Sequence, residues 1–305
     1  MHILTTFEWK TFFKELYDKV FETEVSSSAA QVAFYFSFAF FPLLLFLVSL
    51  FGMVLDSTDE LRRELYQYLA QIMPQSAYQL VHTTMDEIIE TSSGGKLTIG
   101  LLVTLWSASA GVDSIRTALN RVYEVSETRP WWRTKLQSLV LTFLFILLLA
   151  IVLAGVTAGW SLVKVSLAGL GLEVTSPWLL TTIQWGSLVV VMLFATTVVY
   201  SWVPCFRRFH WFWITPGAVT AIIVWILAGW LFRVYLQYFN TYSKAYGSLG
   251  AVIILMLWMY ITGLALLLGG AINSVLAEMA EKREIEAEKE NRASEGEESD
   301  DPSNV

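Results

Sequence analysis

Long apolar runs are the feature that most constrains what this chain can fold into. Several of them exceed the roughly 18 residues that mark a helix able to span a bilayer. The composition agrees, because 55% of the 305 residues are hydrophobic and 15% are charged, whereas a soluble domain carries about 25% charged residues. The sequence therefore predicts an all-α, polytopic membrane protein.

Six segments are predicted to cross the membrane and to form a six-helix transmembrane bundle, the membrane domain at residues 26–280. Their ranges are 29–55, 97–119, 136–160, 178–203, 213–236 and 247–277. The second segment has the shortest continuous apolar stretch. It is kept because six spans give a consistent distribution of basic residues, which a five-span arrangement would weaken.

Three further segments flank or connect these spans. Residues 1–25 are predicted to be an amphipathic helix that lies on the membrane or packs on the bundle. Its apolar face consists of Trp9, Phe12, Phe13, Leu16, Tyr17, Val20 and Phe21. Residues 56–96 are predicted to be a periplasmic loop with two short amphipathic helices, and residues 281–305 an acidic, disordered tail.

The basic residues predict which side of the membrane each loop occupies. With six spans, 14 Lys and Arg residues fall on the side of the two termini and six on the other side. Because cytoplasmic loops carry the excess of basic residues, both termini are expected in the cytoplasm. Trp131, Trp132 and Trp202 then fall at the inner interface, where amphipathic rings prefer to lie.

Polar residues at the cytoplasmic ends of the spans form the candidate binding site, because burying them in lipid is costly. Asp113 and Arg116 are three residues apart on a helix, and Asn120 shares their face. The predicted substrate-binding set is Asp113, Arg116, Asn120, Asn273, Arg207 and Arg208. We expect the first three and Asn273 to line one cavity, with an arginine of 207–208 at its rim. The glycines before Asn273 would let the second span approach.

Each of these features also has a structural interpretation. Asp113 and Arg116 can be an ion pair at a helix end, and Arg207 and Arg208 can be simple topology determinants. Pro42, inside the first span, can be a kink or a gate. The other candidates for bending or gating are Gly247, Gly250 and Pro216.

An enzymatic site is not indicated. The three histidines, His2, His82 and His210, lack metal-ligand spacing, and no hydrolase, phosphate-loop or dinucleotide motif occurs. One cysteine, Cys205, excludes a disulfide framework and a cysteine-rich zinc site. We therefore predict no catalytic residue, no metal and no cofactor.

Three segments of the chain resemble the YihY/BrkB family of bacterial inner-membrane proteins, once labelled ribonuclease BN. They are "SSSAAQVAFYFSFAFFPLLLFLVSLFG" (26–52), "LWSASAGVDSIRTALNRVYEV" (105–125) and "AYGSLGAVIILMLWMYITGLALLLGGAIN" (245–273). The resemblance covers roughly residues 10–280. It implies a six-span protein of the bacterial inner membrane and gives a lead toward envelope lipid export, but it supplies no catalytic residues.

Three classes of function follow from these observations. The first is a transporter or flippase of an amphipathic envelope molecule, an anionic lipid by preference, with membrane lipids as its partners. The second is a non-transporting scaffold for envelope integrity, as a homo-oligomer or with envelope proteins. The third, a ribonuclease, is disfavoured because nothing in the sequence holds two metals, and basic juxtamembrane residues indicate topology and anionic lipid rather than nucleic acid.

Overall fold

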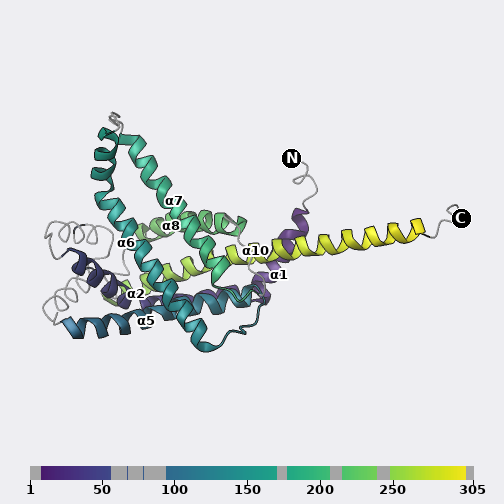
Figure 1. The fold of residues 1–305 in the computed structure, drawn as a ribbon, viewed down its shortest axis with the longest axis horizontal. Helices are drawn as coiled ribbons and strands as arrows, with labels where there is room; N and C mark the ends of the chain where they lie inside the picture. The colour runs from purple at the N-terminus through teal and green to yellow at the C-terminus, as the bar shows by residue number, and fades with distance from the viewer. Residues whose placement is uncertain are drawn as a thin grey trace.

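The protein is described here from a computed structural model, which covers residues 8–55, 94–169, 177–206, 215–238 and 248–299, together with the isolated positions 67 and 78. These parts of the chain are all-helical (Figure 1). The helices are α1 (Trp9–Glu22), α2 (Val25–Leu55), α5 (Gly94–Val122), α6 (Trp131–Gly169), α7 (Pro177–Trp202), α8 (Pro216–Tyr238) and α10 (Ser248–Ser299). The predicted periplasmic loop lies outside the described residues, apart from positions 67, 78 and 94–96.

The six predicted spans coincide with α2, α5, α6, α7, α8 and α10. Within the described residues, four helical stretches are long and apolar enough to cross a membrane. They are Trp131–Val152, Trp185–Trp202, Pro216–Leu236 and Val252–Ile285. The membrane class is thus supported by four helices, whereas the crossing of α2 and α5 stays a prediction. In α5, serines, threonines and the charges of Asp113 and Arg116 reduce the hydropathy.

Helices α2, α5 and α10 pack against one another, and Figure 1 shows them running side by side. Small residues allow this close approach, as they commonly do between membrane helices. A Cβ added at Gly111 of α5 would lie 3.1 Å from the ring of Phe36 in α2. One added at Gly263 of α10 would lie 3.3 Å from Val32 of α2. The core around these contacts includes the fully buried Leu119 of α5.

Helix α8 lies on another side of α10, and the two backbones nearly touch. A Cβ at Gly269 would collide with the carbonyl of Gly217 and with the hydroxyl of Tyr200. That hydroxyl donates to the carbonyl of Leu266 at 2.6 Å, which ties α7 to α10. Helices α6 and α7 make few contacts with each other and diverge in Figure 1.

The apolar face predicted for the N-terminal helix divides into two stripes. Phe12 packs with Val275 and Met279 of α10, and Leu16 contributes to the same cluster. A second stripe is exposed and has a spacing of four residues: Trp9, Phe13, Tyr17 and Phe21. Helix α1 thus packs on the bundle, and its contact with a membrane surface remains a prediction.

The acidic C-terminal segment differs from the disordered tail predicted above. Helix α10 continues as far as Ser299 and projects beyond the other helices (Figure 1). Residues 281–285 of this projection are exposed. Strong helix formers explain the difference, because the segment is rich in Glu, Lys, Ala and Arg, and Glu288 stands four residues before Arg292, a spacing at which opposite charges support a helix in water.

Candidate functional site

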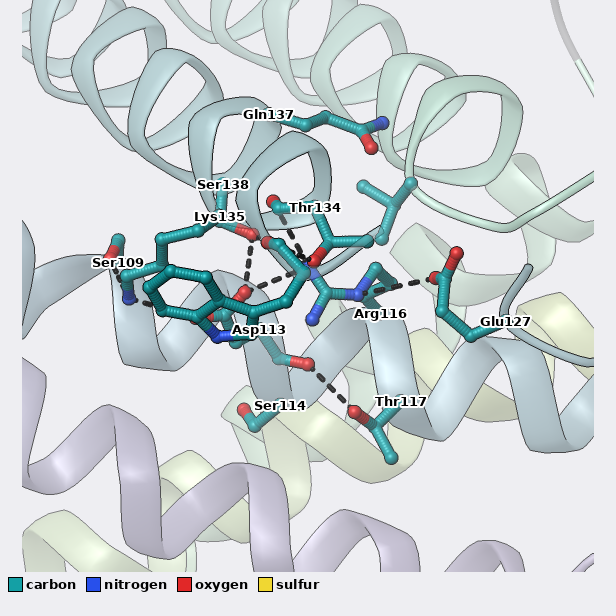
Figure 2. A network of polar contacts seen from close by, with 12 residues as sticks. Ser109, Asp113, Ser114, Arg116, Thr117, Glu127, Thr134, Lys135, Gln137 and Ser138 are labelled. Atoms are coloured by element: carbon teal, nitrogen blue, oxygen red, sulfur yellow. Dashed lines mark hydrogen bonds and ion pairs between the residues drawn. The ribbon is translucent and has the colours of Figure 1, made fainter. Parts of the chain in front are cut away.

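Asp113 lies at the centre of a charged network between α5 and α6 (Figure 2). Its Oδ1 accepts a hydrogen bond from Arg116 Nη1 at 2.8 Å and one from Ser138 Oγ at 2.6 Å. The same Nη1 of Arg116 lies 3.2 Å from the carbonyl of Thr134 and 3.0 Å from Ser138 Oγ. The predicted pairing of Asp113 with Arg116 is therefore present, and α6 completes it.

Lys135 of α6 is the second cation on Asp113. Its Nζ lies 3.0 Å from Asp113 Oδ2 and donates to Ser109 Oγ at 2.6 Å. It also lies 4.5 Å from the centre of the Trp106 ring, within the range of a cation–π contact. One carboxylate thus serves two cations whose side chains are only 14% (Arg116) and 12% (Lys135) exposed.

A second carboxylate, Glu127 in the loop between α5 and α6, extends the network. Arg129 clamps it in two-pronged fashion, with Nε on Oε1 and Nη2 on Oε2, each at 2.8 Å. The hydrogen bonds and charge of Arg129 hold the pKa of Glu127 at about 2, below its ordinary value of 4.5. Glu127 Oε2 also lies 3.5 Å from Arg116 Nε and accepts from Asn120 Nδ2 at 3.1 Å.

The charges of this network do not cancel. Arg116, Lys135 and Arg129 carry three positive charges, and Asp113 and Glu127 carry two negative charges. All five side chains are between 12% and 30% exposed, so solvent screens their interactions only partly. The arrangement can therefore attract a further anion.

Asn273, the fourth residue of the predicted cavity, makes a different set of contacts. Its Oδ1 accepts from the backbone N–H of Gly217 at 2.8 Å, and its Nδ2 donates to Thr215 Oγ1 at 3.1 Å. Thr215 Oγ1 also accepts from the N–H of Ala218 at 3.2 Å. Asn273 thus satisfies the N–H of Gly217 in the first turn of α8, which a helix start leaves without a helical partner, and holds Thr215 just before the helix.

Helix α5, the predicted second span, lies close to one of the glycines before Asn273. A Cβ at Gly270 would lie 2.9 Å from Leu119 Cδ2 of α5. The turn of α5 next to Asn120 therefore packs on the turn of α10 next to Asn273. Asn120 itself points to the loop and to α7, where its Oδ1 accepts from the N–H of Cys205 at 2.9 Å.

The remaining predicted residues are only partly described. Arg207, Arg208 and Gly247 lie outside the described residues. Pro42 lies within the continuous α2, and Gly250 is buried in the first turn of α10. Pro216 is the first residue of α8, where its fixed φ and missing N–H are favourable.

Sequence reasoning missed the partners that α6 and the loop supply: Glu127, Arg129, Thr134, Lys135 and Ser138. It also missed Ser109, which α5 itself contributes. A signal was available in "RTKLQS", where Lys135 and Ser138 are three residues apart at the start of a strongly apolar helix. Lys19 was also missed, although it is almost fully buried between Glu124 at 2.7 Å and Glu278 at 2.6 Å.

A cavity of about 290 Å³ lies on another face of α6, next to α7. It is lined by Arg133, Leu136, Gln137, Val140, Leu141 and Trp202. Gln137 accepts from Arg129 Nη1 at 2.5 Å and donates to the carbonyl of Trp202, so it connects the cavity wall to the network. Over the described residues, no three His, Cys, Asp or Glu side chains are grouped as a metal site would require.

Four apolar helical stretches of spanning length, with a partly buried charged network at the start of one of them, define a helical membrane protein. The chain belongs to the family described as Virulence factor BrkB, whose model matches residues 16–294.

Named relatives agree with this assignment. The chain is 32% identical over 268 residues to the ribonuclease-like protein YfkH of Bacillus subtilis (strain 168), covering 87% of this chain and 95% of that protein. It is 24% identical over 284 residues to a UPF0761 membrane protein of Aggregatibacter aphrophilus (strain NJ8700), covering 92% and 97%. A UPF0761 membrane protein of Stenotrophomonas maltophilia (strain K279a) is 25% identical over 88% of this chain and 61% of that protein. No solved structure matches.

Proposed function

We propose that this protein is an inner-membrane transporter that moves an anionic amphipathic molecule, an anionic lipid, between the leaflets. The observation that supports this proposal is the unequal charge of the network, which holds three cations against two carboxylates between apolar helices. A phosphate headgroup would balance that charge. It would also offer the acceptor oxygens that guanidinium and ammonium groups bind best.

Arg116 and Lys135 are the proposed headgroup ligands. Both are held by Asp113, so an arriving phosphate can take over their donors one at a time while Asp113 keeps the other. Arg116 would bind the phosphate in two-pronged geometry, and Lys135 would act as a point charge. Since the sequence contains no ATP-binding motif, transport would use an ion gradient or run downhill.

The proposal includes six spans, with both termini in the cytoplasm, in the inner membrane of a bacterium. The distribution of basic residues supports this topology. Reporter fusions after residue 75 should give a periplasmic signal, and fusions after residues 127 and 290 a cytoplasmic one. A periplasmic signal at residue 127 would mean that α5 does not cross, and the network would then lie on the wrong side.

The transport proposal is tested with the full chain in liposomes that contain a fluorescent phosphatidylglycerol. Translocation would be measured for the wild type, Arg116→Lys and Arg116→Ala, with folded yield measured in parallel. Lys282→Ala is the control, because its pair with Glu15 is exposed and lies outside the network. We expect Arg116→Lys to fold normally and to translocate at least tenfold more slowly. Full translocation by well-folded Arg116→Ala protein would refute the headgroup site.

A scaffold is the second candidate, favoured by the helical projection of α10 beyond the bundle. Its exposed residues could bind a partner without any transport. This alternative is preferred if wild-type protein fails to translocate lipid in liposomes while a deletion of 286–305 abolishes the function of the protein in the cell.

A further inference from the structure

We propose that the cavity between α6 and α7 is a binding site for one anionic phospholipid, with its phosphate at Arg133 and one acyl chain along the cavity wall. We call this cavity the α6–α7 groove; its six lining residues are those named above. It uses none of the cations of the network, and the inference does not rest on the transport proposed above.

Arg133 is the cation of this region whose charge is left uncompensated. The other four basic residues between 116 and 135 each have a carboxylate partner: Arg116 and Lys135 pair with Asp113, Arg121 with Glu24, and Arg129 with Glu127. Among the ion pairs of the described residues, none involves Arg133. Its recorded contact is with the ring of Trp132, at 5.1 Å from the ring centre. This side chain is exposed and can bind an anion from the bilayer surface.

The wall of the groove is apolar along the part of α6 that follows Arg133. Leu136, Val140 and Leu141 follow it at helical spacing on one face of α6, so the groove has a charged end and an apolar end. From residue 133 to residue 141 a helix rises about 12 Å, at about 1.5 Å per residue. One leaflet of the hydrocarbon core is about 15 Å thick, so the apolar wall matches the depth that an acyl chain occupies.

The α7 side of the groove is fixed by three hydrogen bonds. Gln137 donates to the carbonyl of Trp202 and accepts from Arg129, which also donates to the carbonyl of Val203 at 3.1 Å. Gln137 is therefore occupied, and it holds the ends of α6 and α7 at a set separation. Leu136, Val140 and Trp202 are 55%, 45% and 45% exposed, so the groove opens sideways to the surroundings of the helices.

The volume and the charge together select the ligand. About 290 Å³ is at the lower limit of pockets that hold small molecules, so the groove takes one chain of a lipid rather than the whole molecule. An uncompensated guanidinium favours a lipid with net negative charge over a zwitterionic lipid, whose ammonium group it would repel. Tryptophan at the charged end is typical of the membrane interface.

The experiment uses the full-length protein in phosphatidylcholine vesicles that contain a small fraction of phosphatidylglycerol with a photoactivatable acyl chain. After illumination, labelled peptides are quantified by mass spectrometry. We expect labelling to concentrate on residues 131–152 and 185–202. Arg133→Gln should reduce phosphatidylglycerol labelling there about fivefold, the effect of one basic residue near an anionic surface. It should leave labelling by a matched diacylglycerol probe unchanged.

Two matched pairs of variants separate a site from general lipid contact. Leu136→Trp fills the groove and should reduce labelling by both probes, whereas Val190→Trp, on an exposed part of α7 outside the groove lining, should not. Arg233→Gln removes an exposed cation of α8 and should change nothing. Equal labelling of every exposed apolar face, or unchanged labelling in folded Arg133→Gln and Leu136→Trp proteins, would overturn the proposal. Neither result depends on whether the protein translocates lipid.

Discussion

Replacing Lys19 by Met should loosen α1 from the bundle. The side chain of Lys19 is only 6% exposed, and it joins Glu124, after the end of α5, to Glu278 of α10. Burial by itself lowers the pKa of Lys19, but its hydrogen bonds to the two glutamates outweigh burial, and the net pKa is raised. The folded protein therefore keeps Lys19 charged at neutral pH. This stabilisation is complete below pH 10.5 and is lost only as the pH rises through the raised pKa.

The size of the effect follows from the exposure of the three groups. A hydrogen bond to a charged group contributes about 1.5–3 kcal/mol, and Lys19 makes two. Glu124 and Glu278 are 60% and 41% exposed, so in the variant water can hydrogen-bond to the carboxylate oxygens that Lys19 no longer contacts. We therefore expect Lys19→Met to lower the free energy of opening of α1 by about 2 kcal/mol. This is well below the 3–5 kcal/mol lost when one partner of a fully buried ion pair is removed. Met conserves the apolar stem of Lys19, so packing changes little.

Hydrogen exchange of the α1 amides, measured in detergent, is the assay, because it reports local opening. A loss of about 2 kcal/mol corresponds to about 30-fold faster exchange over residues 9–22. Lys282→Met is the matched control: it also removes a lysine that joins α1 and α10, but its pair with Glu15 is exposed at Lys282, so its loss should change the exchange of the α1 amides little. If both variants accelerate exchange equally, the claim that the buried ion pairs of Lys19 stabilise the packing of α1 on the bundle is refuted.

Three further outcomes are expected. Gly269→Ala should lower the free energy of unfolding in detergent by about 1–3 kcal/mol, because its Cβ would collide with the backbone carbonyl of Gly217. Gly186→Ala, with nothing within 4 Å of its Cβ, should be neutral or stabilising. Equal effects of the two substitutions would refute the tight α8–α10 contact. The stability advantage of wild type over Glu127→Gln should be complete above about pH 4.5 and should disappear as the pH falls toward 2, because Arg129 depresses the pKa of this carboxyl; an advantage that persists at pH 2 would refute this assignment. Deleting 286–305 should leave the unfolding temperature nearly unchanged, and a large loss of folded protein would show that this segment docks on the bundle.

Periodicity and hydropathy were sufficient to predict the helices of this fold. Each predicted span falls on a helix, because long apolar runs have few alternatives in a membrane protein. The exact ends were less predictable: α6 begins at Trp131, five residues before its predicted span, and its first turns contain the polar residues Arg133, Thr134 and Lys135. The sequence does not show whether a helix ends before such polar residues or continues through them.

The candidate site was predictable only within one helix. Asp113 and Arg116 are three residues apart, and that spacing alone predicts their contact. The polar pair Lys135 and Ser138 at the start of α6 was a local hint, but it does not say which helix they contact. The packing of α5 on α6 and the path of the loop, which bring Lys135 and Glu127 into the network, have no local signal. The contacts of Asn273 were also not predictable from the local sequence. Its depth suggested the common cavity, but its amide caps α8, a partner more than fifty residues away in the chain.

The contacts also divide the network into two parts with different tasks. Around Glu127, two of the bonds fasten the chain just after α7: Asn120 accepts from the N–H of Cys205, and Arg129 donates to the carbonyl of Val203. The bond to Val203 satisfies a carbonyl at the C-terminal end of α7, where a helix leaves carbonyls unpaired, so a ligand could displace it only by leaving that carbonyl without a partner. Around Asp113, the partners are instead side chains that can exchange one acceptor for another. Arg116, 3.5 Å from Glu127 and 2.8 Å from Asp113, lies between the two parts. An anion is therefore expected to displace Asp113 from Arg116 while the bonds of Glu127 keep the helices in place.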